Sequence, residues 1–414
     1  MSRLATDILI VGGGPAGLAA AAAASETAGK CITVVDDNPN LGGQIWKASL
    51  GRFRSAEARN LIDALSTGKV HIVNHAQVFG SLNTCTLLAE TPEGSLELEF
   101  EKLIIATGAR EMFLPFSGWT LPNVCGAGGL QALVKGGLKI ENRRVVVAGT
   151  GALLLVVAEF LKTKGANVVA IAEQAPVAKI NRFALGLWRS PTKILQAIDL
   201  KRKLFDIPYL TDCWVKSAGG ESNLTTVELT RRGKNWTVEC DYLACGFHLV
   251  PNTELAAVLG CRIEEGFVSV NEYQETSIEN IFCAGEPTGI GGVEASLIEG
   301  KIAGLTACGE TEKASRLFTR RGKARRFGDT LNKTFALREE LKLLPNADTI
   351  VCRCEDIDYG RLTEFSNFRD AKLQTRCGMG PCQGRICGTA TNFLFGWKPG
   401  SVRPPIFPVK MENL

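Results

Sequence analysis

The chain has 414 residues, 45% hydrophobic and 22% charged, with a formal net charge of +4. It is long enough for two or three domains that each bury a core, and its small charge does not favour nucleic acid as a partner. Fourteen cysteines without the spacing of secreted proteins, and no signal peptide, predict a cytoplasmic protein. The apolar run 8–24 is interrupted by glycines, so we expect a buried strand and helix there and no transmembrane segment.

The N-terminal segment predicts a dinucleotide-binding unit. Residues 7–11 read as a buried strand, and a glycine turn and the start of a helix follow in the G-x-G-x-x-G spacing. A second predicted strand, 31–36, ends at Asp36. Such glycines admit a pyrophosphate to the helix N-terminus, and the acid accepts hydrogen bonds from a ribose. The turn residues expected at the phosphate are Gly12, Gly14, Pro15, Ala16 and Gly17.

Three further segments are predicted to complete this first nucleotide site. A glycine loop after the first acid can lie along the cofactor. Two later strands, within 102–110 and 280–286, end in small-residue turns that bring backbone amides and a carboxylate to the ligand. The alternative for these turns is plain structure, a buried strand and a tight bend. The residues concerned are Gly43, Gln44, Thr107, Gly108, Gly285 and Glu286.

The same unit recurs at 144–151 and 168–173. In both copies the first glycine and the acid are 24 positions apart, which makes a chance match improbable. We therefore expect Gly149, Gly151 and Glu173 to bind a second nucleotide, NAD rather than NADP, because the acid would repel a 2′-phosphate. Leu154 stands where the third glycine would lie. A scaffold that binds nothing is the open alternative.

The segment 313–345 predicts a basic helix. Phe327, Leu331 and Phe335 recur every four residues and would give it one apolar face. It is either a solvated linker or a surface that docks a phosphate or a partner.

Four cysteines near the C-terminus predict a metal centre. They are spaced as Cys352-x-Cys354 and Cys377-x4-Cys382, and glycines between the second pair let the backbone approach inorganic sulfide. This favours a [2Fe–2S] cluster, with zinc or free structural cysteines as alternatives. Cys387 repeats the spacing, but we expect a helix from Pro381 to turn it away from the glycine loop, so it is left out of the ligand set.

These elements predict an α/β chain with two dinucleotide-binding domains and a small helical cluster domain. The expected boundaries are 1–118 with 247–312 for the first domain, 119–246 for the second, 313–345 for the linker, and 346–414 for the [2Fe–2S] domain and tail.

The motifs at 12–17, 42–44, 106–110 and 284–286 resemble the flavoprotein fold of thioredoxin and glutathione reductases. The cysteine module resembles the bacterioferritin-associated-ferredoxin type of [2Fe–2S] domain. Together, over essentially the whole chain, they resemble the alpha subunit of heteromeric dye-linked amino-acid dehydrogenases. That family includes opine oxidases, D-hydroxyproline and L-proline dehydrogenases, hydrogen cyanide synthase and heterotetrameric sarcosine oxidase.

The sequence departs from these families in two places. Glu286 stands where Asp is common in the flavin reductases, although its longer side chain could still reach a hydroxyl. Cys125, Cys245 and Cys283 are isolated, without a C-x-x-C or C-x4-C dithiol in the nucleotide-binding domains. We therefore expect no disulfide reduction.

The resemblance implies an electron-relay and scaffold subunit with no catalytic residues of its own for the amino acid. A flavoprotein beta subunit would oxidise an opine, hydroxyproline or proline-like secondary amine, and the complex would have room for an optional small third subunit. FMN at the subunit interface and [2Fe–2S] would pass electrons to a quinone or dye, and FAD, or else ATP or NAD, would fill the first nucleotide site. The protein would be cytoplasmic, free or peripheral to the inner membrane. The alternatives are an NADH-dependent flavin reductase that serves a ferredoxin-like partner, and a redox-sensing module.

Overall fold

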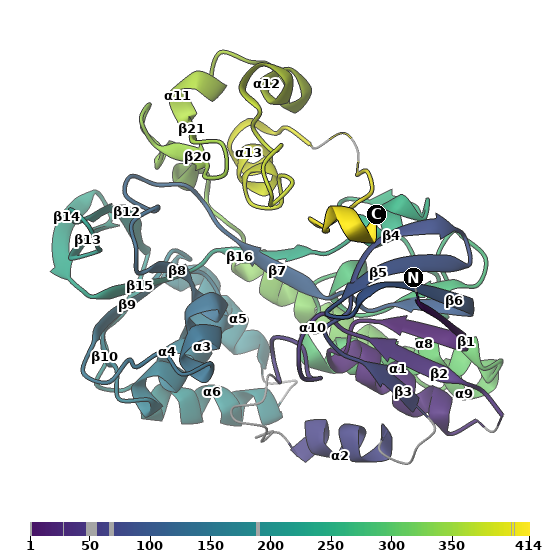
Figure 1. Cartoon of the computed structure of the whole chain (residues 1–414). Coiled ribbons are helices and arrows are strands. Elements are labelled where there is room, and N and C mark those ends of the chain that lie inside the picture. The colour runs from purple at the N-terminus through teal and green to yellow at the C-terminus, as the bar shows by residue number, and fades with distance from the viewer. Residues whose placement is uncertain are drawn as a thin grey trace. The chain divides into compact units, whose positions relative to one another are not determined.

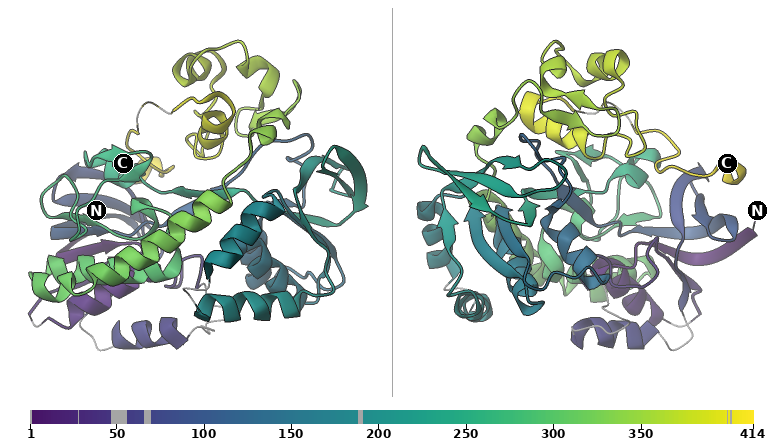
Figure 2. Two further views of the ribbon diagram at one scale, coloured as in Figure 1. Left: turned by 180° about the vertical axis from the view of Figure 1, so that it is seen from behind. Right: turned by 60° about the vertical axis from the view of Figure 1, so that its left-hand side comes forward.

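The computed structural model describes residues 2–27, 29–46, 56–65, 70–187, 191–398, 400 and 402–414. The chain divides into two compact units. Unit 1 comprises 1–110, 251–329 and 401–414, and unit 2 comprises 111–250 and 330–400. Strands β7 (Ala109–Met112) and β16 (His248–Pro251) each span a boundary of this division. Helix α10 (Phe318–Thr334) is the predicted basic helix, and the division of the chain falls within it (Figure 2).

Unit 1 is built on a mixed sheet with strand order β3-β2-β1-β6-β5-β4. Parallel pairing joins β1 to β2 and β6, and β19 pairs with the second half of β6. Its strands are β1 (Ser2–Val11), β2 (Ile32–Val35), β3 (Val70–Val73), β4 (Gln77–Asn83), β5 (Thr86–Thr91), β6 (Gly94–Ile105), β17 (Ile263–Glu264), β18 (Phe267–Val268) and β19 (Ile281–Cys283). Its helices are α1 (Pro15–Ser25), α2 (Ala56–Leu65), α7 (Glu254–Val258), η2 (Glu286–Thr288), α8 (Gly292–Ala307), α9 (Thr311–Ser315) and η4 (Met411–Asn413).

Small residues let helices α1 and α8 pack together on one face of this sheet, as Figure 1 shows. A side chain on Gly300 would overlap the backbone of Ala16, and one on Gly304 would overlap that of Ala20. The strands beneath are buried on both faces, with Ile8, Leu9 and Ile10 at most 1% exposed. Continuous apolar strands of this kind are typical of parallel sheets covered by helices.

Unit 2 carries the second βαβ repeat and the cysteine-rich segment. Its main sheet has the order β11-β10-β9-β15-β8, and β12-β13-β14 form an antiparallel layer. Its strands are β8 (Val124–Gly126), β9 (Arg144–Gly149), β10 (Asn167–Glu173), β11 (Tyr209–Thr211), β12 (Cys213–Gly219), β13 (Thr226–Arg231), β14 (Lys234–Glu239), β15 (Tyr242–Gly246), β20 (Ile350–Cys352) and β21 (Ile357–Asp358). Its helices are α3 (Ala127–Lys135), α4 (Ala152–Thr163), α5 (Val177–Gly186), α6 (Pro191–Lys203), η3 (Glu339–Leu343), α11 (Tyr359–Leu362), α12 (Phe368–Thr375) and α13 (Cys387–Phe395).

The cysteine-rich segment has a small core of its own and is anchored within unit 2. Phe368 and Trp397 are buried beside the cysteines. The indole N–H of Trp119 donates to the carbonyl of Ile350 at 2.5 Å. This contact fixes the start of β20, the strand that leads into the first cysteine pair.

The C-terminal tail differs from the predicted domain boundary. Residues 402–414 were expected with the cysteine domain, but they belong to unit 1. The amide of Ile406 donates to the carbonyl of Phe79 at 2.7 Å, and the side-chain amide of Asn413 donates to Glu90 at 2.7 Å. The tail therefore extends the hydrogen-bonding of β4 and β5. In the described parts of the chain, no helix is both long and apolar enough to span a membrane.

Candidate functional site

The glycines of the first turn have different physical roles. A side chain on Gly17 would overlap the carbonyl of Gly12, and one on Gly12 would overlap the carbonyl of Ala106. These two glycines are required by the packing of helix on strand. On Gly14, by contrast, a β-carbon would meet nothing nearer than the α-carbon of Gly43, at 4.0 Å. Gly14 therefore keeps a surface open where a phosphate can approach the start of α1.

Asp36 holds this turn in place from the end of β2. Its side chain is 6% exposed, and its Oδ2 accepts from the amide of Gly13 at 2.5 Å. Its Oδ1 accepts from the backbone and side-chain amides of Asn38, both at 2.8 Å. A carboxylate has about four acceptor positions, so Asp36 can still accept from a ribose hydroxyl.

Of the other residues predicted for the first site, some lie beside the glycine turn and others have structural roles elsewhere. Gly43 lies against Gly14, because the amide of Gly42 donates to the carbonyl of Gly13 at 2.8 Å, and Gln44 follows as an exposed side chain. Thr107 is engaged elsewhere, since its hydroxyl donates to the carbonyl of Asn252 at 2.7 Å. Gly108 is needed for a left-handed backbone with a φ of 67°.

Glu286 presents an unsatisfied oxygen beside the first turn. The preceding Gly285 has a φ of 82°, and a β-carbon there would lie 2.9 Å from that of Ala16. The Oε1 of Glu286 accepts from the amide of Gly292 at 3.2 Å, but its Oε2 is buried without a partner among the described residues. Burial raises the pKa of Glu286 to about 7. A buried acceptor of this kind fits a hydroxyl donor on a bound nucleotide.

We expect Glu286→Gln to flatten the pH dependence of stability. The folded-state pKa of Glu286 is raised from 4.5 to about 7, so the folded chain binds more protons in that window. Its free energy of unfolding should therefore fall as pH rises from 4.5 to 7, by up to about 3 kcal/mol from this group.

Urea denaturation of the nucleotide-free chain at pH 5 and pH 7.5 measures this effect. The variant should lose the part of the fall that Glu286 contributes, whereas the exposed control Glu279→Gln should keep the full fall. Equal pH dependence in wild type and Glu286→Gln would contradict the assignment. Glu173, whose pKa is also raised to about 7 by burial, supplies a second contribution that both chains retain.

The second glycine turn is arranged differently. Gly149 cannot carry a side chain, because one would overlap the carbonyl of Gly246. Glu173 is completely buried, and accepts from the amides of Gly151 at 2.7 Å and Ala175 at 2.8 Å. Leu154, at the place of the missing third glycine, is fully buried against Gly246.

Five cysteines converge in the C-terminal part of unit 2. The sulfurs of Cys352, Cys377 and Cys387 all lie within 4.8 Å of one another. The thiol of Cys382 makes hydrogen bonds with those of Cys387 and Cys354. Thiols gathered this closely, with no disulfide among the described residues, suit a metal or an iron–sulfur centre.

The expectation that Cys387 points away from the other thiols is wrong. A helix was expected from Pro381, but Gln383 and Gly384 have φ angles of 50° and 77°, which an α-helix cannot accommodate. Helix α13 therefore begins only at Cys387, and its first residue faces the other sulfurs. The repeated spacing from Cys382 to Cys387, together with Gly384, was the signal that could have identified this ligand candidate.

Hydrogen bonds among the thiols make some of them easy to ionise. Those from Cys377 and Cys387 lower the pKa of Cys352 to about 2. The bond from Cys387 likewise lowers the pKa of Cys382 to about 5. Cys387 donates these hydrogen bonds, and they raise its own pKa. Thiolates are the form that binds metals.

A cavity of about 420 Å³ opens beside these cysteines within unit 2. Apolar and aromatic side chains form much of its wall, with the ring centroids of Phe113 and Trp119 only 5.0 Å apart. Sequence reasoning did not identify this aromatic wall. The lining residues of the cavity are Phe113, Trp119, Val124, Cys125, Gly126, Cys352, Arg353, Cys354, Cys382, Ile386 and Cys387.

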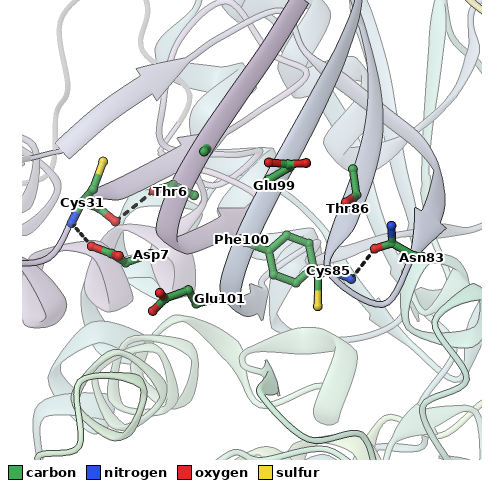
Figure 3. A pocket seen from close by; sticks show the side chains of 10 residues that line it. Thr6, Asp7, Cys31, Asn83, Cys85, Thr86, Glu99, Phe100 and Glu101 are labelled. Atoms are coloured by element: carbon green, nitrogen blue, oxygen red, sulfur yellow. Dashed lines mark hydrogen bonds between the residues drawn. The ribbon is translucent and has the colours of Figure 1, made fainter.

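A second cavity, of about 500 Å³, lies in unit 1, and Figure 3 shows the side chains that line it. It is lined by Thr6 and Asp7 in the middle of β1, by Cys31 just before β2, by the β4–β5 turn and by residues 99–101 of β6. The carboxylate of Asp7 accepts from the amide of Cys31 at 2.6 Å, as Figure 3 shows. Dinucleotides bind at the carboxyl ends of parallel strands, so this cavity is not part of the candidate site.

Two βαβ units of the dinucleotide-binding type and a cysteine-rich segment define the class of this chain as an oxidoreductase with two dinucleotide-binding folds. The family model described as pyridine nucleotide-disulphide oxidoreductase matches residues 6–301. The chain belongs to that family. The solved thioredoxin reductase of T. acidophilum is similar in fold, with a TM-score of 0.58 and 20% identity, covering 74% of this chain and 99% of its own. The predicted fold class is thus confirmed.

Two curated relatives that match nearly the whole chain are named as subunits. Hydrogen cyanide synthase subunit HcnB of Pseudomonas protegens is 30% identical, over 92% of this chain and 89% of its own. An opine oxidase subunit of Rhizobium meliloti is 28% identical, over 99% of this chain and 87% of its own. L-proline dehydrogenase from P. horikoshii has the same fold, with a TM-score of 0.72 and 18% identity over 100% of this chain and 80% of its own. The predicted resemblance is confirmed.

Proposed function

We propose that this chain is the electron-relay and scaffold subunit of a heteromeric dehydrogenase that acts on amino or imino acids. The observation that carries the proposal is the convergence of five cysteines in a segment joined to two dinucleotide-binding folds. The relatives named as subunits of hydrogen cyanide synthase and opine oxidase support it. An opine, hydroxyproline or proline-like secondary amine is the substrate class we assign to the complex.

The cysteines fit a [2Fe–2S] cluster, which supplies one-electron transfer when bound. Cys352, Cys354 and Cys382 are three of the ligands we propose, as the sequence predicts. For the fourth, the structure supports Cys387 over Cys377. Cys387 lines the cavity together with the other three, whereas Cys377 does not.

The first nucleotide site fits an adenine nucleotide. Gly14 leaves the start of α1 accessible to a pyrophosphate, and no described side chain caps that helix. Asp36 can accept from a ribose, and the orphaned oxygen of Glu286 can accept from a further hydroxyl. FAD is the nucleotide we assign, with ATP or NAD as alternatives that satisfy the same contacts.

The partner we propose is a flavoprotein beta subunit that removes the hydride equivalent, with FMN at its interface with this chain. The aromatic wall of the cavity beside the cysteines supports a planar redox ligand or acceptor, such as a quinone, within reach of the cluster. The residues of this chain hold and orient these groups. We place the complex in the cytoplasm.

Comparing the isolated chain with the complex tests the proposal. The purified chain should show neither amino-acid-dependent dye reduction nor rapid NADH oxidation. Coexpression with a flavoprotein beta subunit should raise dye reduction by at least about 100-fold with a secondary-amine substrate. Rapid NADH turnover by the isolated chain would instead support a flavin or ferredoxin-type reductase. Amino-acid turnover by the isolated chain would contradict both.

A further inference from the structure

The nucleotide-binding edge of the second fold is covered by the chain itself. Strands β9 and β10 end at Gly149 and Glu173, the edge where a dinucleotide binds in such folds. Phe335 lies there and is only 8% exposed. A β-carbon built on Gly151 would lie 3.9 Å from that of Phe335. The Phe335 ring also packs edge-on against Phe183, with 5.9 Å between ring centroids.

The backbone of this segment takes up polar groups of the second turn. The hydroxyl of Thr150 is within hydrogen-bonding distance both of Glu173, at 2.9 Å, and of the carbonyl of Phe335, at 3.1 Å. The side-chain amide of Gln174 donates to the carbonyl of Ala336 at 3.1 Å. Thr150 and Gln174 lie next to the glycines and the acid, where a nucleotide would bind. Both side chains are instead hydrogen-bonded to backbone carbonyls of the segment that contains Phe335.

The segment is also fastened at its far end. The amide of Arg338 donates to the side-chain oxygen of Gln174 at 3.2 Å, and its guanidinium donates to Asp212 at 3.4 Å. The same guanidinium lies 4.2 Å from the ring centroid of Trp214. Leu341 continues the anchoring, because it is completely buried in the core of unit 2. A covering held by this many contacts behaves as part of the fold rather than as a surface loop.

We propose that residues Phe335–Arg338 are a built-in plug that replaces the dinucleotide in the second fold. The fold is then a nucleotide-free scaffold, and it positions the chain that enters the cysteine-rich segment. Gly149, Gly151 and Glu173 belong to this structural arrangement and do not bind NAD. The plug does not depend on the relay role, since it concerns only which ligands the second fold can accept.

A ligand-binding experiment tests the proposed plug without substituting any residue of Phe335–Arg338. In a Gly14→Val chain, which removes the contribution of the first site, NADH titrated to 1 mM should give no saturable fluorescence change. Saturable binding that is lost on a further Glu173→Ala substitution would overturn the proposal, because it would place NADH at the second turn.

Amide hydrogen exchange of the full chain, read by mass spectrometry, gives an independent test. Phe335→Ala should speed exchange at the Gly149–Gly151 turn at least about tenfold. Leu343→Ala is the matched control, because Leu343 follows in the same connecting segment but is 83% exposed, and it should leave the turn unchanged. Unchanged exchange at the turn in Phe335→Ala would overturn the plug. If that variant fails to fold, the NADH titration still decides the question.

Discussion

Replacing Cys352, Cys354, Cys382 or Cys387 with Ser, one at a time, should abolish the iron–sulfur centre. A serine hydroxyl is a far weaker iron ligand than a thiolate, so iron should fall from about two per chain to below about 0.2. The visible absorbance should disappear, and dye reduction by the complex should drop by at least about 100-fold. Iron analysis and absorption spectra of the purified variants measure the loss, and dye reduction by the complex reports on the relay.

Two further variants make this experiment specific. Cys377→Ser should keep the absorbance, because Cys377 does not line the cavity with the four proposed ligands. Cys85→Ser is the control for general effects of losing a thiol, since Cys85 is exposed in unit 1. Loss of iron in Cys377→Ser with a silent Cys387→Ser would restore the ligand set predicted from sequence. Zinc in place of iron in the wild type would contradict the cluster itself.

The repeat could be predicted from the sequence because short-range patterns determine it. Two strands, a glycine turn and an acid at a fixed interval define each βαβ unit, and both units form at the predicted positions. Leu154, at the place of the third glycine, left open whether the second copy binds a nucleotide. The contact of the second turn with Phe335 could not be predicted, because Thr150 donates to a carbonyl that lies 185 positions further along the chain.

The sequence predicted that cysteines gather near the C-terminus, and the error in that prediction concerns the direction of Cys387. Spacing alone indicated which thiols could gather, but their direction depends on where α13 begins. Pro381 favoured an early helix start, and the left-handed backbone at Gln383 and Gly384 prevents it. The tail was misplaced for a different reason. Its contacts with Phe79 and Glu90 pair residues more than 300 positions apart, which no local pattern reveals.

Gly14→Val should empty the first nucleotide site while leaving the fold intact. The wild-type chain should release about one adenine nucleotide per chain on denaturation, and the variant less than about 0.1, because the added side chain occupies the approach of the phosphate. The fold should tolerate the change, since a β-carbon on Gly14 makes only an ordinary 4.0 Å contact with Gly43. Chromatography with mass spectrometry of the released nucleotide measures its amount and distinguishes FAD from ATP or NAD.

The neighbouring glycines show why Gly14 is the informative position. Gly12→Val or Gly17→Val would overlap backbone carbonyls, so either variant would lose nucleotide through misfolding. Gly186→Val on α5 is a better control, because a side chain there meets nothing within 4 Å. It should retain the nucleotide, and the circular dichroism of both variants should match the wild type. A nucleotide-free wild-type chain with an intact fold would refute the site, whereas a fully loaded Gly14→Val chain would show that the phosphate lies elsewhere.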